Sequence, residues 1–344
     1  MKRVFIHAYT EQNLGDDMFI KYLCNRYPEV DFYLSCKDYY AAAFNKICNL
    51  NILDEFKYSR SMNFDLQIVI GGSIFMQSVN KNIFEKYASD KKIKIPNIPT
   101  YIIGANFGPY KSKIFRLLYK HWFKSIDGIV FRDEYSYNLF RFSNMRWAPD
   151  ILFNYDFPDL VTKKIISVSC IKQNRRSGLS NYNEELYFKK LAEILEIYSR
   201  LGFSINLTAF STVQGDDIAA KTIYNLLSIQ AKSVAEISVY QGNIDRFLKQ
   251  ILSSAYIIGT RFHSIILGWN AGIPVFPICY NSKSKNAISS YGFKGNYIDI
   301  DKISETDFQY IDLNRTIGTG VDIKDLKNEA ENHFLILDKV LKEQ

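Results

Sequence analysis

The sequence is poor in the residues that build metal sites and disulfide frameworks. Its 344 residues include only five cysteines and four histidines. The cysteines are odd in number and no two form a C-x-x-C pair, so neither a disulfide framework nor a tetrahedral zinc site is indicated. We expect the cysteines to be buried free thiols, because an unoxidised cysteine behaves as a small hydrophobic residue.

Long apolar runs are also missing. The longest uncharged apolar stretch, 265–280, contains two glycines and two prolines, which would break a membrane helix. Near the start of the chain, the apolar residues give way to polar ones by Thr10, which is too early for a signal peptide. We therefore expect a cytoplasmic protein, which can work at the inner face of the membrane.

The sequence has no dense run of basic residues and no dense run of acidic residues. Lysine and arginine number 43 against 36 aspartates and glutamates, which gives a net charge of +7. This excess suits an acidic small molecule, an anionic polymer or an anionic membrane surface, and its scatter argues against nucleic acid. Conversely, 25 Phe and 24 Tyr supply a large core, and the length favours about two domains.

Short apolar runs alternate with longer segments of helical period, as in stacked βα units. In the first half we expect strands at Val4–Ala8, Gln67–Ile70, Thr100–Ile103 and Gly128–Phe131, and helices at Asp16–Arg26 and Lys113–Lys124. After a proline-containing connector over 147–164, we expect strands at Ile165–Cys170, Ser204–Ala209, Glu236–Val239, Tyr256–Gly259 and Val275–Ile278, and helices at Glu184–Leu201 and Asn243–Ser253. The last segment, Ile323–Leu341, has the period of an amphipathic helix.

These two series predict an α/β protein with two Rossmann-like lobes that face a cleft and a C-terminal closing helix. The predicted boundaries are 1–155 for the N-terminal lobe, 163–320 for the C-terminal lobe and 321–344 for the closing helix. In open parallel sheets the ligand binds beyond the carboxyl ends of the strands. Candidate functional residues should therefore lie where the strands end.

Three strand ends in the first half carry polar or glycine-rich motifs. In Asn-Leu-Gly-Asp-Asp at 13–17, Asn13 and Asp16 can present polar atoms to the cleft, or can simply cap the next helix. Gly71 and Gly72 let a ligand or a backbone come close. The third motif, 104–109, places Asn106 between two glycines. Each motif is weak by itself, because glycine is common at strand-to-helix turns.

A fourth motif, Thr-Arg-Phe-His-Ser at 260–264, is more specific. It places Arg261 and His263 between a strand end and a helix N-terminus, where oriented N–H groups favour an anion. Arginine matches a carboxylate or phosphate, and histidine exchanges protons near neutral pH. Further on, Lys283 lies in a polar loop and can either close over a negative ligand or remain solvated. We expect His121 and His333 on helix surfaces.

Taken in order, these motifs resemble the polysaccharide pyruvyl transferase family. The resemblance spans most of the chain and implies a fold similar to that of the two-lobed glycosyltransferases of the B type. It also implies that phosphoenolpyruvate donates a pyruvate ketal to a sugar, with the donor in the second lobe and the acceptor sugar at the first-lobe loops. The other elements that carry the resemblance are Arg132 with Ser136, Pro149-Asp150, Gly272-Ile273-Pro274 and Tyr280.

Two positions depart from the pattern of that family. Ser73 stands where a third glycine is common, and the segment after the first strand of the second lobe lacks an arginine that is frequent there. Lys172, Arg175 or Arg176 can replace this arginine. If none of them does, the donor is something other than phosphoenolpyruvate.

The resulting hypothesis is a pyruvyl transferase of bacterial surface-polysaccharide assembly, for an exopolysaccharide or a capsule, without cofactor or metal. The methylene carbon of phosphoenolpyruvate must be protonated before a sugar hydroxyl attacks, so His263 is the candidate general acid and Asp16 a candidate base or hydroxyl anchor. The expected substrate-binding residues are Arg261, Lys283, Tyr280, Asn13, Gly71, Gly72, Asn106 and Lys172.

Two alternatives stay open at this point. A nucleotide-sugar glycosyltransferase of the same shape would use Arg261 and Lys283 to hold a diphosphate, and a non-catalytic glycan-binding relative would bind without turnover. For the main hypothesis, the expected partners are phosphoenolpyruvate and a saccharide or lipid-linked oligosaccharide, with peripheral membrane contact and no nucleic acid.

Overall fold

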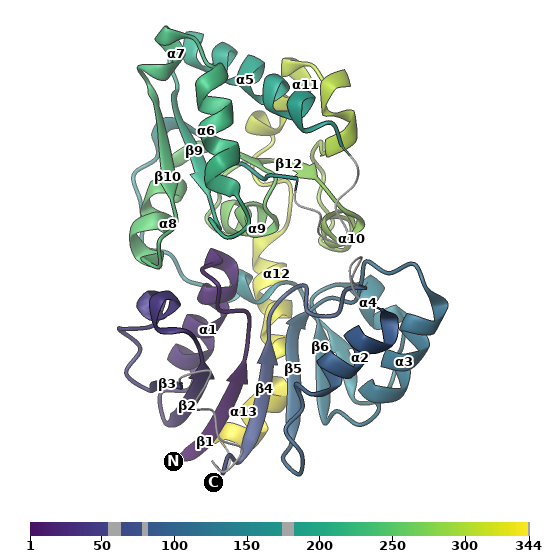
Figure 1. Cartoon of the computed structure of the whole chain (residues 1–344). Coiled ribbons are helices and arrows are strands. Elements are labelled where there is room, and N and C mark those ends of the chain that lie inside the picture. Colours follow the sequence, from purple (N-terminus) through teal and green to yellow (C-terminus); the bar gives the residue numbers. More distant parts are fainter. Residues whose placement is uncertain (54–62, 78–81, 174–181, 343–344) are drawn as a thin grey trace.

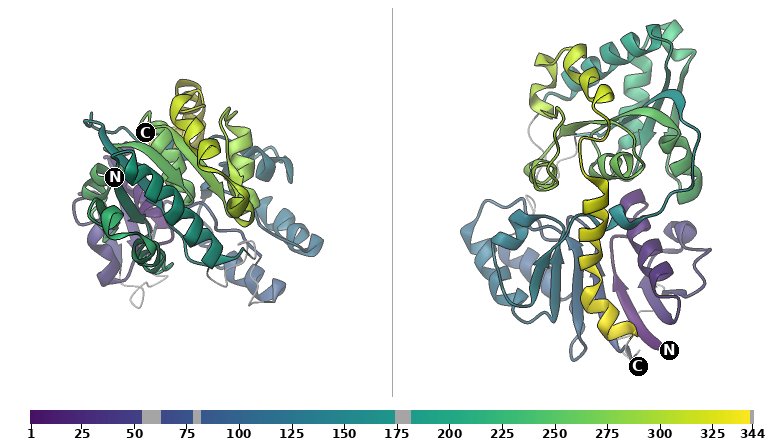
Figure 2. Two further views of the ribbon diagram at one scale, coloured as in Figure 1. Left: turned by 90° about the horizontal axis from the view of Figure 1, so that it is seen from above. Right: turned by 180° about the vertical axis from the view of Figure 1, so that it is seen from behind.

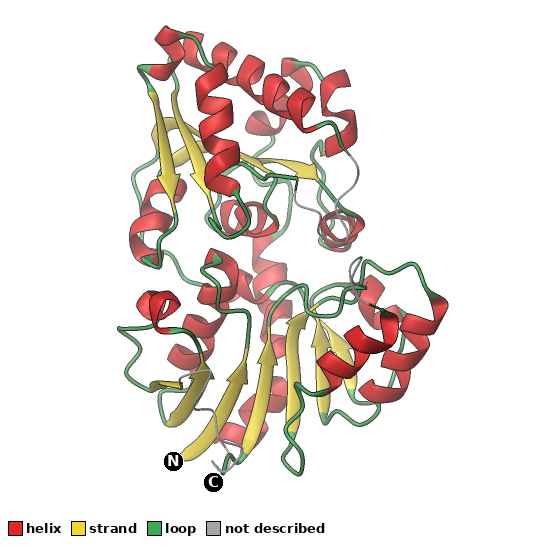
Figure 3. Cartoon of the chain, in the orientation of Figure 1, coloured by secondary structure: helices red, strands yellow, loops and turns green. Residues whose placement is uncertain are grey.

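The computed structural model describes residues 1–53, 63–77, 82–173 and 182–342, and it contains two α/β lobes stacked on each other (Figures 1 and 3). The first lobe has a seven-stranded parallel sheet in the order β3-β2-β1-β4-β5-β6-β7. The second has a six-stranded parallel sheet in the order β10-β9-β8-β11-β12-β13. The predicted two-lobed α/β fold is confirmed.

The first lobe buries its central strands completely, as expected for parallel strands covered by helices on both faces. Its strands are β1 (Lys2–His7), β2 (Val30–Ser35), β3 (Leu50–Leu53), β4 (Leu66–Ile70), β5 (Thr100–Ala105), β6 (Gly128–Phe131) and β7 (Met145–Trp147). Its helices are α1 (Leu14–Arg26), α2 (Ile83–Lys91), α3 (Lys113–Phe123) and α4 (Glu134–Asn138), with 3-10 turns η1 (Asp38–Ala43) and η2 (Ile151–Asn154).

The second lobe repeats the alternation of strands and helices. Its strands are β8 (Lys163–Ser169), β9 (Ser204–Ala209), β10 (Ala235–Val239), β11 (Ser254–Gly259), β12 (Val275–Cys279) and β13 (Ile298–Asp299). Its helices are α5 (Glu184–Arg200), α6 (Asp216–Leu226), α7 (Ile229–Lys232), α8 (Ile244–Leu252), α9 (Phe262–Asn270), α10 (Ser282–Ser290) and α11 (Phe308–Thr316), with the 3-10 turn η3 (Ile300–Glu305).

The C-terminal segment leaves the second lobe and runs along the back of the first (Figure 2). It is divided into α12 (Ile323–Ala330), η4 (Glu331–His333) and α13 (Leu335–Lys342), rather than forming the single helix predicted. Arg26 of α1 forms ion pairs of 2.7 Å with Glu331 and 3.0 Å with Asp338. The segment therefore fastens onto the first lobe although it follows the second in sequence.

The side chain of His333 is fully buried, so its predicted place on a helix surface is wrong. Its Nε2 lies 2.8 Å from the carbonyl oxygen of Pro149. Burial lowers the pKa of His333 to about 4, so the ring is neutral and Nε2–H donates to this carbonyl. The C-terminal segment thereby supports the crossover between the lobes. His121 is exposed, as predicted.

Helix α1 also joins the lobes. The hydroxyl of Tyr240 donates to Oδ2 of buried Asp17 at 2.7 Å, and Lys21 forms an ion pair of 2.7 Å with Asp245. One hydrophobic cluster continues from the first sheet through α1 into the second lobe. Helix α1 therefore contacts the second lobe through a hydrogen bond, an ion pair and shared apolar packing.

Four of the five cysteines are buried as free thiols, as predicted, whereas Cys48 is exposed. In the described part of the chain, no helix combines the length and the apolar character needed to cross a bilayer.

Candidate active site between the lobes

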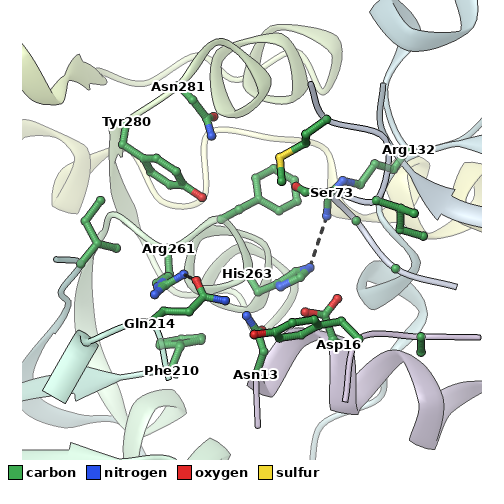
Figure 4. A pocket seen from close by; sticks show the side chains of 18 of the residues that line it. Asn13, Asp16, Ser73, Arg132, Phe210, Gln214, Arg261, His263, Tyr280 and Asn281 are labelled. Carbon is green, nitrogen blue, oxygen red and sulfur yellow. Dashed lines mark hydrogen bonds between the residues drawn. The ribbon is translucent and has the colours of Figure 1, made fainter. Parts of the chain in front are cut away.

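A cavity of about 430 Å³ lies between the lobes, at the carboxyl ends of strands from both sheets (Figure 4). This is the position that the parallel-sheet rule predicts. Eight of the ten predicted site residues line it: Asn13, Asp16, Gly71, Gly72, Lys172, Arg261, His263 and Tyr280. Residues that the sequence did not single out as candidates add to the lining, among them Arg132, Phe210, Gln214 and Asn281.

The remaining candidates differ in their placement. Lys283 belongs to the first turn of α10, but its side chain lies outside the described part of the structure, as do Arg175 and Arg176. Asn106 is buried and does not line the cavity. Its Oδ1 accepts a hydrogen bond of 2.9 Å from Nη2 of Arg132 instead. The prediction that Asn106 contacts the ligand is thus corrected, because its amide supports an arginine.

Arg132 lies directly after β6 on the first-lobe wall, and the sequence alone assigned it no role in the site. Its side chain is only 3% exposed, and Nη1 lies 3.1 Å from Oδ2 of Asp150. The guanidinium carbon stands 4.3 Å from the centre of the Phe262 ring, within cation–π distance. A Cβ atom on Gly72 would overlap with this guanidinium. Gly72 therefore makes room for a side chain from the same lobe.

His263, in the first turn of α9, crosses from the second lobe to the first-lobe wall (Figure 4). Its Nε2 lies 3.4 Å from Nη1 of Arg132 and 3.8 Å from Oδ2 of Asp150. The ring meets Phe19 edge to face, with 5.1 Å between centroids. It also occupies the space next to Gly15, where any Cβ atom would overlap with it. The glycine of the first motif is therefore required by a histidine from the other lobe.

Asp150 lies behind Arg132 and His263 and has no exposed surface. Its Oδ1 accepts the N–H of Leu152 at 3.0 Å and so caps η2. Burial alone would raise the pKa of Asp150, but its interactions with nearby His263 and Arg132 outweigh this effect and hold the pKa at about 2. The site therefore contains an ionised carboxylate behind Arg132 and His263.

Arg261 is fixed on the second-lobe wall by the fully buried Asp216. Its Nε donates to Oδ2 of Asp216 at 2.8 Å, Nη2 donates to Oδ1, and Nη1 donates to Oε1 of Gln214 at 2.5 Å. Asp216 also accepts the backbone N–H groups of Phe210 and Ser211. Of the five guanidinium N–H groups, two have no acceptor among the described residues. Asp216 and Gln214 thus hold the guanidinium in place, and two of its N–H groups remain to bind a ligand.

Polar residues at the start of α1 both cap the helix and face the cavity, the two roles that the sequence allows. Asn13 caps α1 by accepting the N–H of Gly15 at 3.1 Å, and it also lines the cavity. Asp16 follows in the first turn and points into the cavity near His263 (Figure 4). His7 lines the same wall, and burial lowers its pKa to about 4, so it is neutral. Opposite, Tyr280 directs its ring into the cavity.

Residues 13–282 match the polysaccharide pyruvyl transferase family. The chain belongs to this family. The match includes the motifs in both lobes that line the cavity, and the predicted family is confirmed. A curated relative, the amylovoran biosynthesis protein AmsJ of Erwinia amylovora, is 22% identical over 269 residues. That alignment covers 70% of this pyruvyl transferase family member and 63% of AmsJ.

Solved structures of other proteins share the fold of this family member. UDP-GlcNAc 2-epimerase from Neisseria meningitidis, bound to UDP-GlcNAc, has a TM-score of 0.63 at 12% identity and full coverage of both chains. MnaA of S. aureus, solved with UDP, has a TM-score of 0.60 at 10% identity, with 99% and 97% coverage. HepE of Anabaena, solved with UDP and glucose, has a TM-score of 0.56 at 9% identity, with 100% and 98% coverage. The predicted likeness to the glycosyltransferase B fold is confirmed.

No group of three or more His, Cys, Asp or Glu side chains in the described ranges is arranged to hold a metal ion. The titratable groups that line the cavity include arginines, a lysine, two histidines and carboxylates.

Proposed function

We propose that this protein transfers pyruvate from phosphoenolpyruvate to a saccharide, as a cyclic ketal, during assembly of a bacterial exopolysaccharide or capsule. Membership of the polysaccharide pyruvyl transferase family and the likeness to an amylovoran biosynthesis protein support a transferase role in polysaccharide synthesis. The observation that carries the proposal is the convergence of His263, Arg132 and Arg261 on one cavity between the lobes. These groups match an anionic donor that must be protonated.

The donor carries a carboxylate and a phosphate, and the cavity offers cationic groups for both. Arg261 would bind one anionic group through its remaining N–H donors, next to the N-terminus of α9. Lys172 and Arg132 also line the cavity and would bind the other anionic group of the donor. Lys283 and Tyr280 belong to the same proposed site. The acceptor sugar would lie against Asn13, Asp16 and the loop of Gly71 on the first lobe.

In this proposal His263 delivers a proton from its imidazole to the methylene carbon of phosphoenolpyruvate, which leaves C2 electron-poor. Ionised Asp150, 3.8 Å from Nε2, supplies a counter-ion for a positively charged ring. A sugar hydroxyl bonds to C2 as its proton passes to Asp16. The C2–O bond to phosphate then breaks, phosphate leaves with the electron pair, and a second hydroxyl bonds to C2. The second hydroxyl proton leaves with phosphate, and the products are a ketal and inorganic phosphate.

Binding of phosphoenolpyruvate tests this assignment of the donor site. A ligand that binds only the folded protein raises its melting temperature. We expect phosphoenolpyruvate to do so for the wild type and not for Arg261→Ala. Arg261→Lys retains a charge beside Asp216 and should fold normally, yet it loses the fork and should bind weakly. Arg315→Ala, on the distant helix α11, serves as a control that keeps the shift.

The glycosyltransferase alternative makes the opposite prediction. Fold relatives have been solved with UDP or a UDP-sugar. A melting shift with UDP that depends on Arg261, and no shift with phosphoenolpyruvate, would replace the proposed donor by a nucleotide sugar. Binding of phosphoenolpyruvate without release of phosphate in the presence of saccharides would favour the non-catalytic alternative.

A further inference from the structure

Helix α3, on the flank of the first lobe, presents an unusual outer face. Its buried side consists of Phe115, Tyr119, Trp122 and Phe123, all packed in the aromatic core of that flank. On the other side, Leu117 is 66% exposed and Ile114 is 53% exposed. Residues three, four and seven positions apart share one face of a helix. Leu117 is therefore surrounded by Lys113, Lys120, His121 and Lys124, which are all exposed.

The charge on this face has one sign. Residues 109–126 contain five lysines and arginines and no aspartate or glutamate, in a chain whose total net charge is +7. Among the described residues, no carboxylate forms an ion pair with Lys113, Arg116 or Lys120. In the sequence these basic residues are spaced by two to four positions and form no run. Helix α3 and its C-cap gather four of the five, Lys113, Arg116, Lys120 and Lys124, on a helix that also exposes two aliphatic side chains.

This flank is connected to the cavity. The hydroxyl of Tyr119, on the inner side of α3, donates to Oδ2 of Asp90 on α2, and the rings of Tyr87 and Tyr119 are 5.6 Å apart. Asp90 and Ile93 also line the cavity between the lobes. A hydrogen bond from Tyr119 thus joins the inner side of α3 to a residue that lines the cavity.

We propose that the outer face of α3 binds the surface of an anionic phospholipid bilayer. Lysine ammonium groups would pair with the lipid phosphates, while Leu117 and Ile114 enter the interface between headgroups and acyl chains. A second copy of the chain fits this face poorly, because a two-fold contact would bring the same basic side chains of both copies together. The proposal extends the proposed function, since a lipid-linked saccharide acceptor would lie at the same surface. The lipid contact itself requires no turnover.

Vesicle sedimentation with the full chain tests this proposal. We expect binding to vesicles of phosphatidylcholine mixed with phosphatidylglycerol and not to phosphatidylcholine alone, and we expect added salt to weaken it. Changing Lys113, Lys120 and Lys124 together to glutamine should weaken binding about 100-fold, since each lysine near an anionic surface contributes about a factor of five. The matched control changes the exposed Lys221, Lys249 and Lys302 of the second lobe to glutamine.

Both triple variants lower the net charge by the same amount, from +7 to +4. The control should bind like the wild type, and equal losses in the two variants would overturn the proposal because they would reflect overall charge. Leu117→Ser should bind several-fold more weakly, whereas Ile229→Ser, at a position 90% exposed in the second lobe, should not. Equal sedimentation with both vesicle types, or a dimer in light scattering that Leu117→Ser dissociates, would also overturn it. Phosphoenolpyruvate binding without vesicle binding would leave the proposed function standing and refute only the membrane contact.

Discussion

Asp150→Asn should separate the charge of this residue from its structural role. Asparagine has nearly the same volume and retains an oxygen for the N–H of Leu152, which Asp150 accepts at 3.0 Å. It removes the negative charge that lies 3.1 Å from Arg132 and 3.8 Å from His263. The variant therefore leaves the backbone cap in place and takes away the counter-ion of the site.

The size of the effect follows from burial. The side chain of Arg132 is 3% exposed, so in the variant its guanidinium keeps Asn106 and the Phe262 ring but has no carboxylate. Removing one partner of a buried ion pair costs about 3–5 kcal/mol. The same exchange in the partly exposed pair of Asp312 and Arg315 should cost about 1 kcal/mol or less.

Chemical unfolding near neutral pH measures this difference, with Asp312→Asn as the control. The pKa of Asp150 is lowered from 3.8 to about 2, so its stabilising contribution is present above 3.8 and is lost as the pH falls through 2. The gap between wild type and variant should narrow over that range. Adding Arg132→Met should recover part of the loss, because no buried charge is then unpaired. A loss no larger than that of Asp312→Asn would refute the reasoning.

Three further variants test other parts of the site. Gly15→Ala should displace the His263 ring and lower turnover at least about tenfold with little change in phosphoenolpyruvate affinity; normal turnover would contradict the close contact. Asp216→Asn should loosen Arg261 and raise the KM for phosphoenolpyruvate about tenfold, with a smaller effect on kcat. Steady-state kinetics measures both constants, and an unchanged KM would contradict the role given to Asp216. For His333, the folded-state pKa of about 4 lies below the unfolded value of 6.5, so stability is present above 6.5 and falls by up to about 3 kcal/mol toward pH 4. Unfolding of His333→Gln should show a flatter pH dependence in that window, and an unchanged slope would contradict this assignment.

Strands with continuous apolar runs were predictable from the sequence. Gly128–Phe131 and Ser204–Ala209 have the predicted bounds, because central parallel strands are buried on both faces and need such runs. The sequence did not reveal β2 or β3, which lie toward one edge of the first sheet. In β2, buried and half-buried residues alternate, and β3 has only four residues. Their local signals are therefore short or polar.

The closing segment shows why a helical period does not fix a helix. Its apolar residues recur on one side, and a single helix over Ile323–Leu341 was the prediction. The helix is interrupted by η4, where His333 turns inward to the Pro149 carbonyl. Pro149 lies in the connector between the lobes, far from His333 in sequence, so only the tertiary structure reveals this contact.

The candidate site was predictable where strand ends carry unusual residue types, as for Arg261 and His263. The roles of its supporting carboxylates were not, although Asp150 is among the residues that carry the family resemblance. Asp150 and Asp216 each begin a helical turn, where an aspartate is explained locally as a cap or a first-turn residue. Their pairing with arginines depends on elements that are distant in sequence. Likewise, Gly15 indicated a turn, whereas the structure shows that a side chain from the other lobe fills the space beside it.

Product analysis with phosphoenolpyruvate and a panel of lipid-linked and free saccharides tests the central claim most directly. The account predicts a saccharide carrying a pyruvate ketal, identified by NMR, together with one phosphate released for each ketal formed. His263→Gln should abolish both products while phosphoenolpyruvate still raises the melting temperature, since glutamine cannot protonate carbon. Transfer of a sugar with release of a nucleotide from a nucleotide sugar, and no ketal from phosphoenolpyruvate, would contradict the account.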